Sequence, residues 1–89
     1  MFRVRWVRSA LNELAAVWTL ADDRGAVTSA VHQIDEALKV DPEARGESRD
    51  KGRRILLVPP LAVIFKTDPL DRTVSVLAVW RFTRRRDGS

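Results

Sequence analysis

The sequence has 89 residues, of which 45% are hydrophobic, and its formal net charge is +4 at pH 7. A chain of this length forms one domain with a small core. Because it contains no cysteine, a disulfide framework and a thiolate metal site are both excluded. The longest nearly uncharged stretch, residues 55–65, is too short to span a bilayer, and arginines near the start argue against a signal peptide. We therefore expect a soluble protein of the reducing cytoplasm, without contact to a membrane.

Charge is distributed unevenly along the chain. Residues 1–8 carry +3, residues 9–50 carry −5 and residues 51–89 carry +6. Arginine outnumbers lysine thirteen to three, and its planar guanidinium suits forked recognition of phosphate. A basic half suggests a nucleic acid, a ribosome or an acidic protein as partner. A genome that prefers arginine codons would explain the arginine bias equally well, but not its segregation.

The first segment, residues 2–7, alternates large apolar and basic side chains. A period of two is typical of a half-buried strand. We expect Phe2, Val4 and Trp6 to share the buried face of this strand.

A helix is expected over residues 10–21. Ser9 offers its N-cap, and Glu13 lies in the first turn, where the helix dipole favours an acid. One side of the helix is expected to face the core and carries Leu11, Leu14, Ala15 and Trp18. Ala10, Val17 and Ala21 widen this arc beyond what the surface helix of a monomer needs, and Leu20 is apolar on the far side. These four residues are candidates for contact with another protein chain. In the alternative interpretation, Val17 packs beneath the long loop.

A second helix, capped by Asp22 or Asp23, is expected to end near Val40 because Pro42 cannot continue it. Its core-facing residues recur at spacings of four, three and four and are Val27, Val31, Ile34 and Leu38. The short connection predicts that the two helices form an antiparallel hairpin. Residues 41–52 follow as a solvated loop.

Three strands are expected in the remainder of the chain. Residues 53–58 and 61–66 flank a Pro59-Pro60 pair and form a hairpin, and residues 68–71 form a turn. Residues 73–82 form a last strand with little polarity on either side, which favours a central position, covered front and back.

The predicted order is β-α-α-β-β-β. Helices that precede an antiparallel meander are typical of an α+β domain, here with the helical hairpin on one face of a small, mainly antiparallel sheet. Residues 1–86 are expected to form this single domain, and residues 87–89 a disordered tail.

Few residues could carry catalysis. The single histidine, His32, lies off the apolar stripe of its helix and is interpreted as a surface residue. No serine lies in a recognisable catalytic motif, no glycine-rich phosphate loop is present, and tyrosine is absent. The carboxylates Glu43, Glu47 and Asp50 are interpreted as solvated loop charges. No metal and no cofactor is expected.

The remaining signal is cationic. Seven basic residues form the candidate binding surface, and they are Lys51, Arg53, Arg54, Arg81, Arg84, Arg85 and Arg86. If the fold groups them on the open side of the sheet, they would contact phosphates or acidic side chains. The alternative is a solvated rim that keeps the protein soluble. Adjacent strand residues point to opposite faces, so only one of Arg53 and Arg54 can belong to such a surface.

Several stretches together form a pattern of shape and hydrophobicity. They are Val4-Arg5-Trp6-Val7 with Ser9-Ala10-Leu11-Asn12-Glu13-Leu14, the helix end Leu38-Lys39-Val40-Asp41-Pro42, the strands Gly52-Arg53-Arg54-Ile55-Leu56-Leu57-Val58 and Leu61-Ala62-Val63-Ile64-Phe65, and Val76-Leu77-Ala78-Val79-Trp80-Arg81-Phe82. Over residues 2–86 this pattern resembles the RelE/ParE toxins, the toxic half of bacterial toxin–antitoxin pairs. The resemblance implies an α+β fold, a cytoplasmic protein and an antitoxin that wraps and masks it. The apolar side of the first helix would then contact the antitoxin, or a second copy in a homodimer.

The resemblance implies one of two activities. RelE-like members cut messenger RNA on the ribosome with basic side chains, whereas ParE-like members poison DNA gyrase. The nuclease candidates here are Arg53, Arg54, Arg81 and Arg84. Arg53 matches a basic family position, but Ala62 stands where the family commonly has arginine, and the usual C-terminal tyrosine is missing. We therefore expect a ParE-like toxin that binds its target. The alternatives are a ribosome-dependent endonuclease and an inactive relative that serves as an interaction module.

Overall fold

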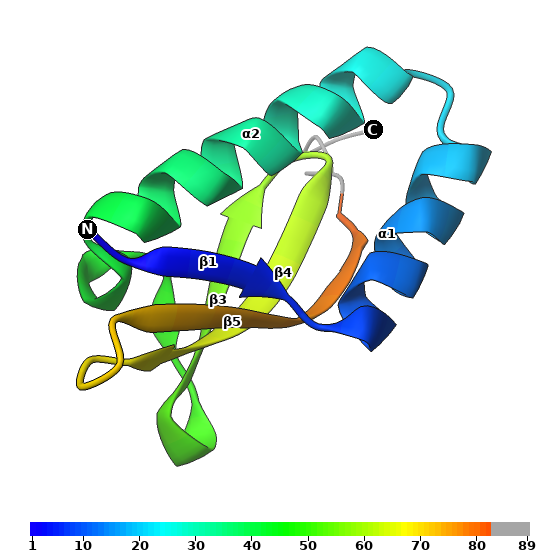
Figure 1. The fold of residues 1–89 in the computed structure, drawn as a ribbon. Helices are drawn as coiled ribbons and strands as arrows, with labels where there is room; N and C mark the ends of the chain where they lie inside the picture. The colour runs from blue at the N-terminus through cyan, green and yellow to red at the C-terminus, as the bar shows by residue number, and fades with distance from the viewer. Residues whose placement is uncertain (83–89) are drawn as a thin grey trace, which may run out of the picture.

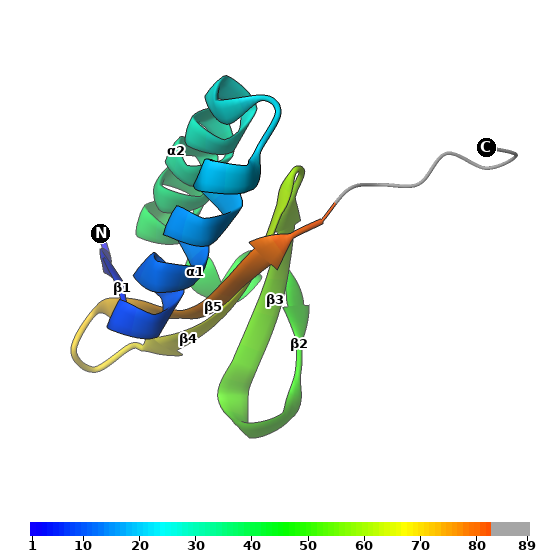
Figure 2. The same cartoon turned by 90° about the vertical axis from the view of Figure 1, so that its right-hand side faces the viewer.

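Two helices lie on one face of a five-stranded sheet in the computed structural model, which describes residues 1–82 (Figures 1 and 2). The elements are β1 (Arg3–Trp6), α1 (Arg8–Leu20), α2 (Arg24–Val40), η1 (Pro42–Ala44), β2 (Glu47–Ser48), η2 (Asp50–Gly52), β3 (Arg53–Val58), β4 (Leu61–Asp68) and β5 (Thr73–Arg81). The predicted α+β fold is confirmed. The expected tail over residues 87–89 lies outside the described residues.

The strand order in the sheet is β1-β5-β4-β3-β2. β1 pairs with β5 in parallel, and the other neighbours pair antiparallel. β5 therefore lies between two strands, as its apolar character predicted. The expectation that it is covered front and back is wrong, because both helices lie on the same side of the sheet (Figure 1). We call the opposite side the open face.

A β-bulge explains why β5 shows no clean alternation. Ile64 of β4 pairs with Ala78, but the next residue, Phe65, pairs with Val76. Leu77 is therefore an extra residue in β5, and the residues after it change faces. Sequence periodicity alone could not have located this change.

The core lies between the helices and the sheet. Its buried members are Ala10, Val27, Ala30, Ile34, Leu38, Leu61, Val63, Phe65, Val74, Val76 and Val79. α2 follows its prediction closely, since Asp23 caps it by accepting a hydrogen bond from the Ala26 N–H (3.0 Å) and the helix ends at Val40. β1 is fixed beneath α2 by the Trp6 Nε1–H, which donates to Asp35 Oδ1 (3.0 Å). α2 packs over β1, β3 and β4.

The start of α1 differs from its prediction. The helix begins at Arg8, and its N-cap residue is Val7, which offers no side-chain hydrogen bond. Ser9 therefore lies inside the first turn and is not the cap. Glu13 lies beyond the first turn, and its Oε1 accepts a hydrogen bond from the Val79 backbone N–H of β5 (3.0 Å). The Glu13 carboxylate thus provides an acceptor for a backbone N–H of β5 at a point beyond the end of β1, where β5 has no strand partner on that side within the described part of the chain.

The predicted core-facing side of α1 is only partly confirmed, because Leu14 packs against the core but Leu11 and Trp18 do not. Ala10 is fully buried, and Val17 and Ala21 pack against the core, whereas Leu11 and Trp18 are 51% and 44% exposed. The two helices run in opposite directions but diverge from their connection (Figure 1), and α1 packs mainly over β5. The side of α1 that would meet α2 in a close hairpin therefore stays open.

The segment predicted as a solvated loop contains a short edge strand. β2 pairs with Ile55 and Arg54 of β3, and Pro42 is buried, but the other side chains of residues 41–52 are exposed. Gly46 has φ 68°, and a Cβ there would collide with the Ile55 carbonyl oxygen. The close approach of β2 to β3 therefore requires glycine at this position.

Candidate functional site

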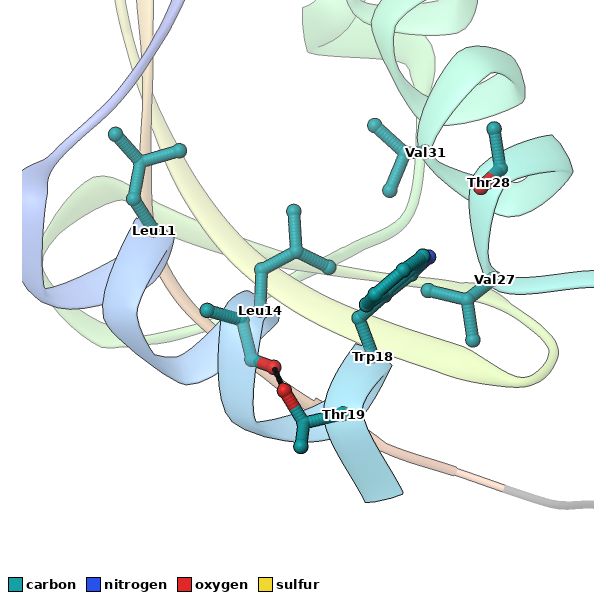
Figure 3. A pocket seen from close by; sticks show the side chains of 8 residues that line it. Leu11, Leu14, Trp18, Thr19, Val27, Thr28 and Val31 are labelled. Atoms are coloured by element: carbon teal, nitrogen blue, oxygen red, sulfur yellow. Dashed lines mark hydrogen bonds between the residues drawn. The ribbon is translucent and has the colours of Figure 1, made fainter. Parts of the chain in front are cut away.

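The diverging helices leave an apolar groove between them, which we call the helix groove (Figure 3). It has a volume of about 390 Å³ and is lined by Leu11, Leu14, Ala15, Trp18, Thr19, Val27, Thr28 and Val31. In Figure 3, Trp18 of α1 points toward Val27 of α2 across the groove. The lining has the concave, apolar character that is typical of a binding site.

Arg24 holds one wall of the helix groove in place. Its guanidinium carbon lies 4.5 Å from the centroid of the Trp18 ring. Its Nε donates to the Trp18 carbonyl oxygen (3.0 Å), and its Nη2 donates to the Thr19 carbonyl oxygen (3.1 Å). The bond to Thr19 satisfies a carbonyl group at the end of α1, whereas the Trp18 carbonyl oxygen also accepts from the Ala21 N–H (3.3 Å). The connection between the helices is thus fixed where the groove begins.

The residues predicted for contact with another chain differ in accessibility, since Val17 and Ala21 are half-buried and line a cavity. Ala10 is 0% exposed, so it cannot take part in such a contact, and Val17 and Ala21 pack against the core. Leu20, 80% exposed, remains free to meet a partner. On α1, Ala10 is thus buried where contact was predicted, and Leu11 and Trp18 are exposed where core was predicted. A helix packed on a single strand is rotated differently from one in a close hairpin, and the apolar arc of α1 was wide enough for both arrangements.

Among the basic residues, the structure separates Arg53 from Arg54. Arg53 pairs with the exposed Lys66 on the open face. Arg54 lies on the other side, where its Nε donates to the Arg45 carbonyl oxygen (2.7 Å) and its Nη2 to the Gly46 carbonyl oxygen (3.1 Å). Arg54 therefore holds the turn before β2 and is not free for a ligand.

Arg81 is also separate from Arg53. It pairs with the buried Leu61, so it lies on the helix side of the sheet. There it lines a second cavity of about 330 Å³ together with Asp22 and Asp23. Lys51 is exposed in η2, and Arg84, Arg85 and Arg86 lie outside the described residues. The expectation that Arg53 and Arg81 group on the open side is therefore wrong.

A different cationic group was missed by the sequence reasoning. Arg5, Ser75, Lys66 and Arg53 are partners in register across four neighbouring strands. Arg5, Ser75 and Lys66 each lie beside residues that pack on the helix side, so they lie on the open face. Arg53 lies on the same face because it pairs with Lys66. We call Arg5, Lys66 and Arg53 the cationic row. The alternation in residues 2–7 already pointed to Arg5, but only the strand register brings it into line with the other two.

The residues that might have carried catalysis are dispersed. His32 is exposed on α2, as predicted, and Glu43, Glu47 and Asp50 are exposed as well. Within residues 1–82, no group of three histidine, cysteine or acidic residues is placed to hold a metal ion. No helix in this part of the chain is long and apolar enough to cross a membrane.

Solved structures resemble this arrangement along nearly the whole chain. The isolated E. coli RelE toxin is 13% identical, with a TM-score of 0.68 over 97% of this chain and 89% of that one. The chain has the RelE/ParE toxin fold. A chain of the toxin–antitoxin complex RelBE2 of Mycobacterium tuberculosis shares the fold at 20% identity, with a TM-score of 0.71 over 90% of this chain and 96% of that one.

The RelE/ParE fold also occurs in the chromosomal ParDE toxin–antitoxin system of P. aeruginosa. A chain of that system is 22% identical, with a TM-score of 0.64 over 93% of this chain and 98% of that one. No family model and no curated protein matches the sequence. RelE and ParE structures thus resemble this chain to similar degrees, and the likeness is one of fold.

Proposed function

We propose that this chain is the toxin of a toxin–antitoxin pair, that it acts in the cytoplasm, and that its antitoxin docks in the helix groove. The observation that carries the proposal is the open apolar groove in a domain that has the fold of RelE/ParE toxins over nearly its whole length. Related folds were solved in complexes named as toxin–antitoxin complexes.

The groove suits an apolar segment of a partner chain. Leu11 and Trp18, large hydrophobic side chains that are half exposed, lie along its α1 wall. Apolar area removed from water contributes about 25 cal/mol per Å², and tryptophan is a frequent anchor of protein interfaces. An amphipathic helix that lies between α1 and α2 would cover both side chains. The sequence predicted an antitoxin contact on the side of α1 that carries Ala10 and Val17. The helix groove instead uses the side that carries Leu11 and Trp18.

We further propose that the toxin acts by binding its target, with DNA gyrase as the expected target. A ribonuclease that relies on cations needs several of them around one phosphate. Of the predicted nuclease candidates, Arg53, Arg54 and Arg81 do not converge on such a point, and Arg54 already donates to two backbone carbonyls. The cations nearest Arg53 are instead the members of the cationic row, which form a line across the strands. The absence of tyrosine points in the same direction. Ribosome-dependent cleavage of messenger RNA is the alternative.

The antitoxin part of the proposal is tested with two neighbouring residues of α2. Thr28 lines the groove, whereas Ser29 is exposed and does not. The toxin is co-expressed with the product of the adjacent reading frame, and binding is measured by co-purification. Thr28→Arg should stop co-purification and leave growth inhibition in place, whereas Ser29→Arg should change neither. Equal co-purification of both variants would contradict docking in the groove.

The target part is tested with two purified systems. Gyrase should produce cleaved DNA when the toxin is added, and ribosomes should leave messenger RNA intact. Ribosome-dependent cuts that disappear in the double variant Arg53→Ala with Arg81→Ala would instead establish the nuclease.

A further inference from the structure

The cationic row has no partner inside the described part of the chain. The salt bridge found within residues 1–82 joins Arg49 and Glu47, and Arg5, Lys66 and Arg53 take part in none. All three are exposed. Because neighbouring strands lie about 4.8 Å apart, Lys66 is roughly 5 Å from Arg53 and roughly 10 Å from Arg5 along the row.

Next to the cationic row the open face is apolar. Two residues further along the strands, Ile55, Ile64 and Ala78 pair across the sheet, and beyond them follow Leu57, Ala62 and Trp80. Leu57 is 43% exposed and Trp80 is 37% exposed. Ala62 itself is fully buried between them. We call the other five residues, Ile55, Ile64, Ala78, Leu57 and Trp80, the apolar strip. No helix of residues 1–82 covers it, because α1 and α2 lie on the other side of the sheet (Figure 2).

We propose that the open face binds an acidic amphipathic helix of the target protein, with carboxylates on the cationic row and aliphatic side chains on the apolar strip. This deepens the proposed function, because it rests on a toxin that acts by binding a protein.

The spacing of the row fits a helix that crosses the strands. Residues three or four apart on a helix lie 5–6 Å from each other, and residues seven apart are separated by about 10 Å along the axis. These separations match the steps from Lys66 to Arg53 and from Lys66 to Arg5. A helix is about 10 Å wide with its side chains, so one flank can reach the row while the adjoining stripe rests on the apolar strip.

The chemistry of the strip favours protein over nucleic acid. Protein surfaces that bind single-stranded nucleic acid interleave cations with aromatic side chains on which the bases stack. On one flank of the row the side chains are aliphatic, namely Ile55, Ile64 and Ala78. On the other flank lie Asp68, Thr73 and Arg3, and Arg49 and Asp50 line a cavity together with Arg53 and Ile55. The aromatic Trp80 lies four residues along the strands from the row, or roughly 13 Å. Aliphatic side chains provide burial for leucine or isoleucine of a partner and no stacking platform.

Binding is tested by fluorescence anisotropy with a labelled helical peptide that carries a leucine stripe and glutamates along one flank. Lys66→Glu, Arg53→Glu and Leu57→Ser should each weaken binding by roughly tenfold. Replacing the peptide's glutamates with glutamine should weaken it to a similar degree. Arg8→Glu, an exposed charge at the start of α1, is the matched control and should leave binding within about twofold. Circular dichroism and the Tm show whether each variant is folded. If a variant does not fold, binding is measured with Lys66→Gln instead.

Four results would overturn the proposal. Equal loss in Arg8→Glu would mean attraction by net charge alone. Tighter binding of single-stranded polyuridine than of the peptide, lost in Lys66→Glu, would assign the face to nucleic acid. Loss of antitoxin co-purification in Lys66→Glu would make the antitoxin the occupant. In cells, Lys66→Glu should abolish growth inhibition and keep antitoxin binding, and retained inhibition would refute the target assignment. If the wild-type chain inhibits nothing, the toxin proposal fails, while the peptide measurement still decides whether the face binds an acidic helix.

Discussion

The contact between Glu13 and β5 gives a quantitative test of how α1 is held. Glu13 Oε1 accepts the Val79 backbone N–H at 3.0 Å in a partly buried position. Glu13→Ala would remove this acceptor and leave the N–H of a buried strand residue without its partner, which costs about 1–3 kcal/mol. Glu13→Gln keeps a carbonyl acceptor and should lose less than half of that amount.

For a domain of this size, 1 kcal/mol corresponds to about 4–8 °C in Tm, so Glu13→Ala should lower the Tm by roughly 10 °C. The free energy of unfolding is measured by urea denaturation and the Tm by circular dichroism. Glu36→Ala is the control, because Glu36 is an exposed glutamate of α2 and should change the free energy by less than about 0.5 kcal/mol. If Glu13→Ala and Glu36→Ala were equally stable, the bond from α1 to β5 would not be holding the helix.

Three further stability predictions concern single contacts. Gly46→Ala should lower the free energy of unfolding by about 2–4 kcal/mol in urea denaturation, because Gly46 has φ 68° and the new Cβ would collide with the backbone of β3. Gly25 has no positive φ, and a Cβ there meets only one atom, at 3.4 Å, so Gly25→Ala should be neutral or slightly stabilising. Equal effects of the two substitutions would contradict this explanation. Arg24→Lys should lower the free energy of unfolding by about 1 kcal/mol because lysine cannot donate to both carbonyls at the end of α1, and an unchanged Tm would show that these bonds contribute nothing. Asp35→Leu should cost about 1–2 kcal/mol by leaving the Trp6 indole N–H without its acceptor, and Asp35→Asn should restore most of it; equal unfolding midpoints for the two variants would refute this role.

Local signals predicted most of the fold. The strand at residues 2–7, the cap at Asp23, the end of α2 before Pro42 and the hairpin at Pro59-Pro60 each depend on a few neighbouring residues, and the structure confirms them. Long-range relations were harder to predict. The apolar arc of α1 fits two rotations of the helix, and only its packing over β5 selects the one that buries Ala10.

The candidate surfaces depend on strand register, which no local pattern reveals. Arg5 and Lys66 are 61 positions apart in the sequence. In the sheet, only β5 lies between their strands, β1 and β4. Arg81 looked equivalent to Arg53, yet the bulge at Leu77 shifts the residues after it to the opposite face. A bulge exchanges faces without changing the hydrophobicity of the strand, so it leaves no trace in composition.

Site-specific photo-crosslinking in the co-expressed toxin–antitoxin complex tests whether the antitoxin docks in the helix groove. A photoreactive residue is placed either at Thr28, in the helix groove, or at Gln33, an exposed position of α2 that does not line it. If the antitoxin docks in the groove, we expect a strong crosslink to it from position 28 and little from position 33. Equal crosslinking from both positions, or none from position 28 in an intact complex, would contradict it.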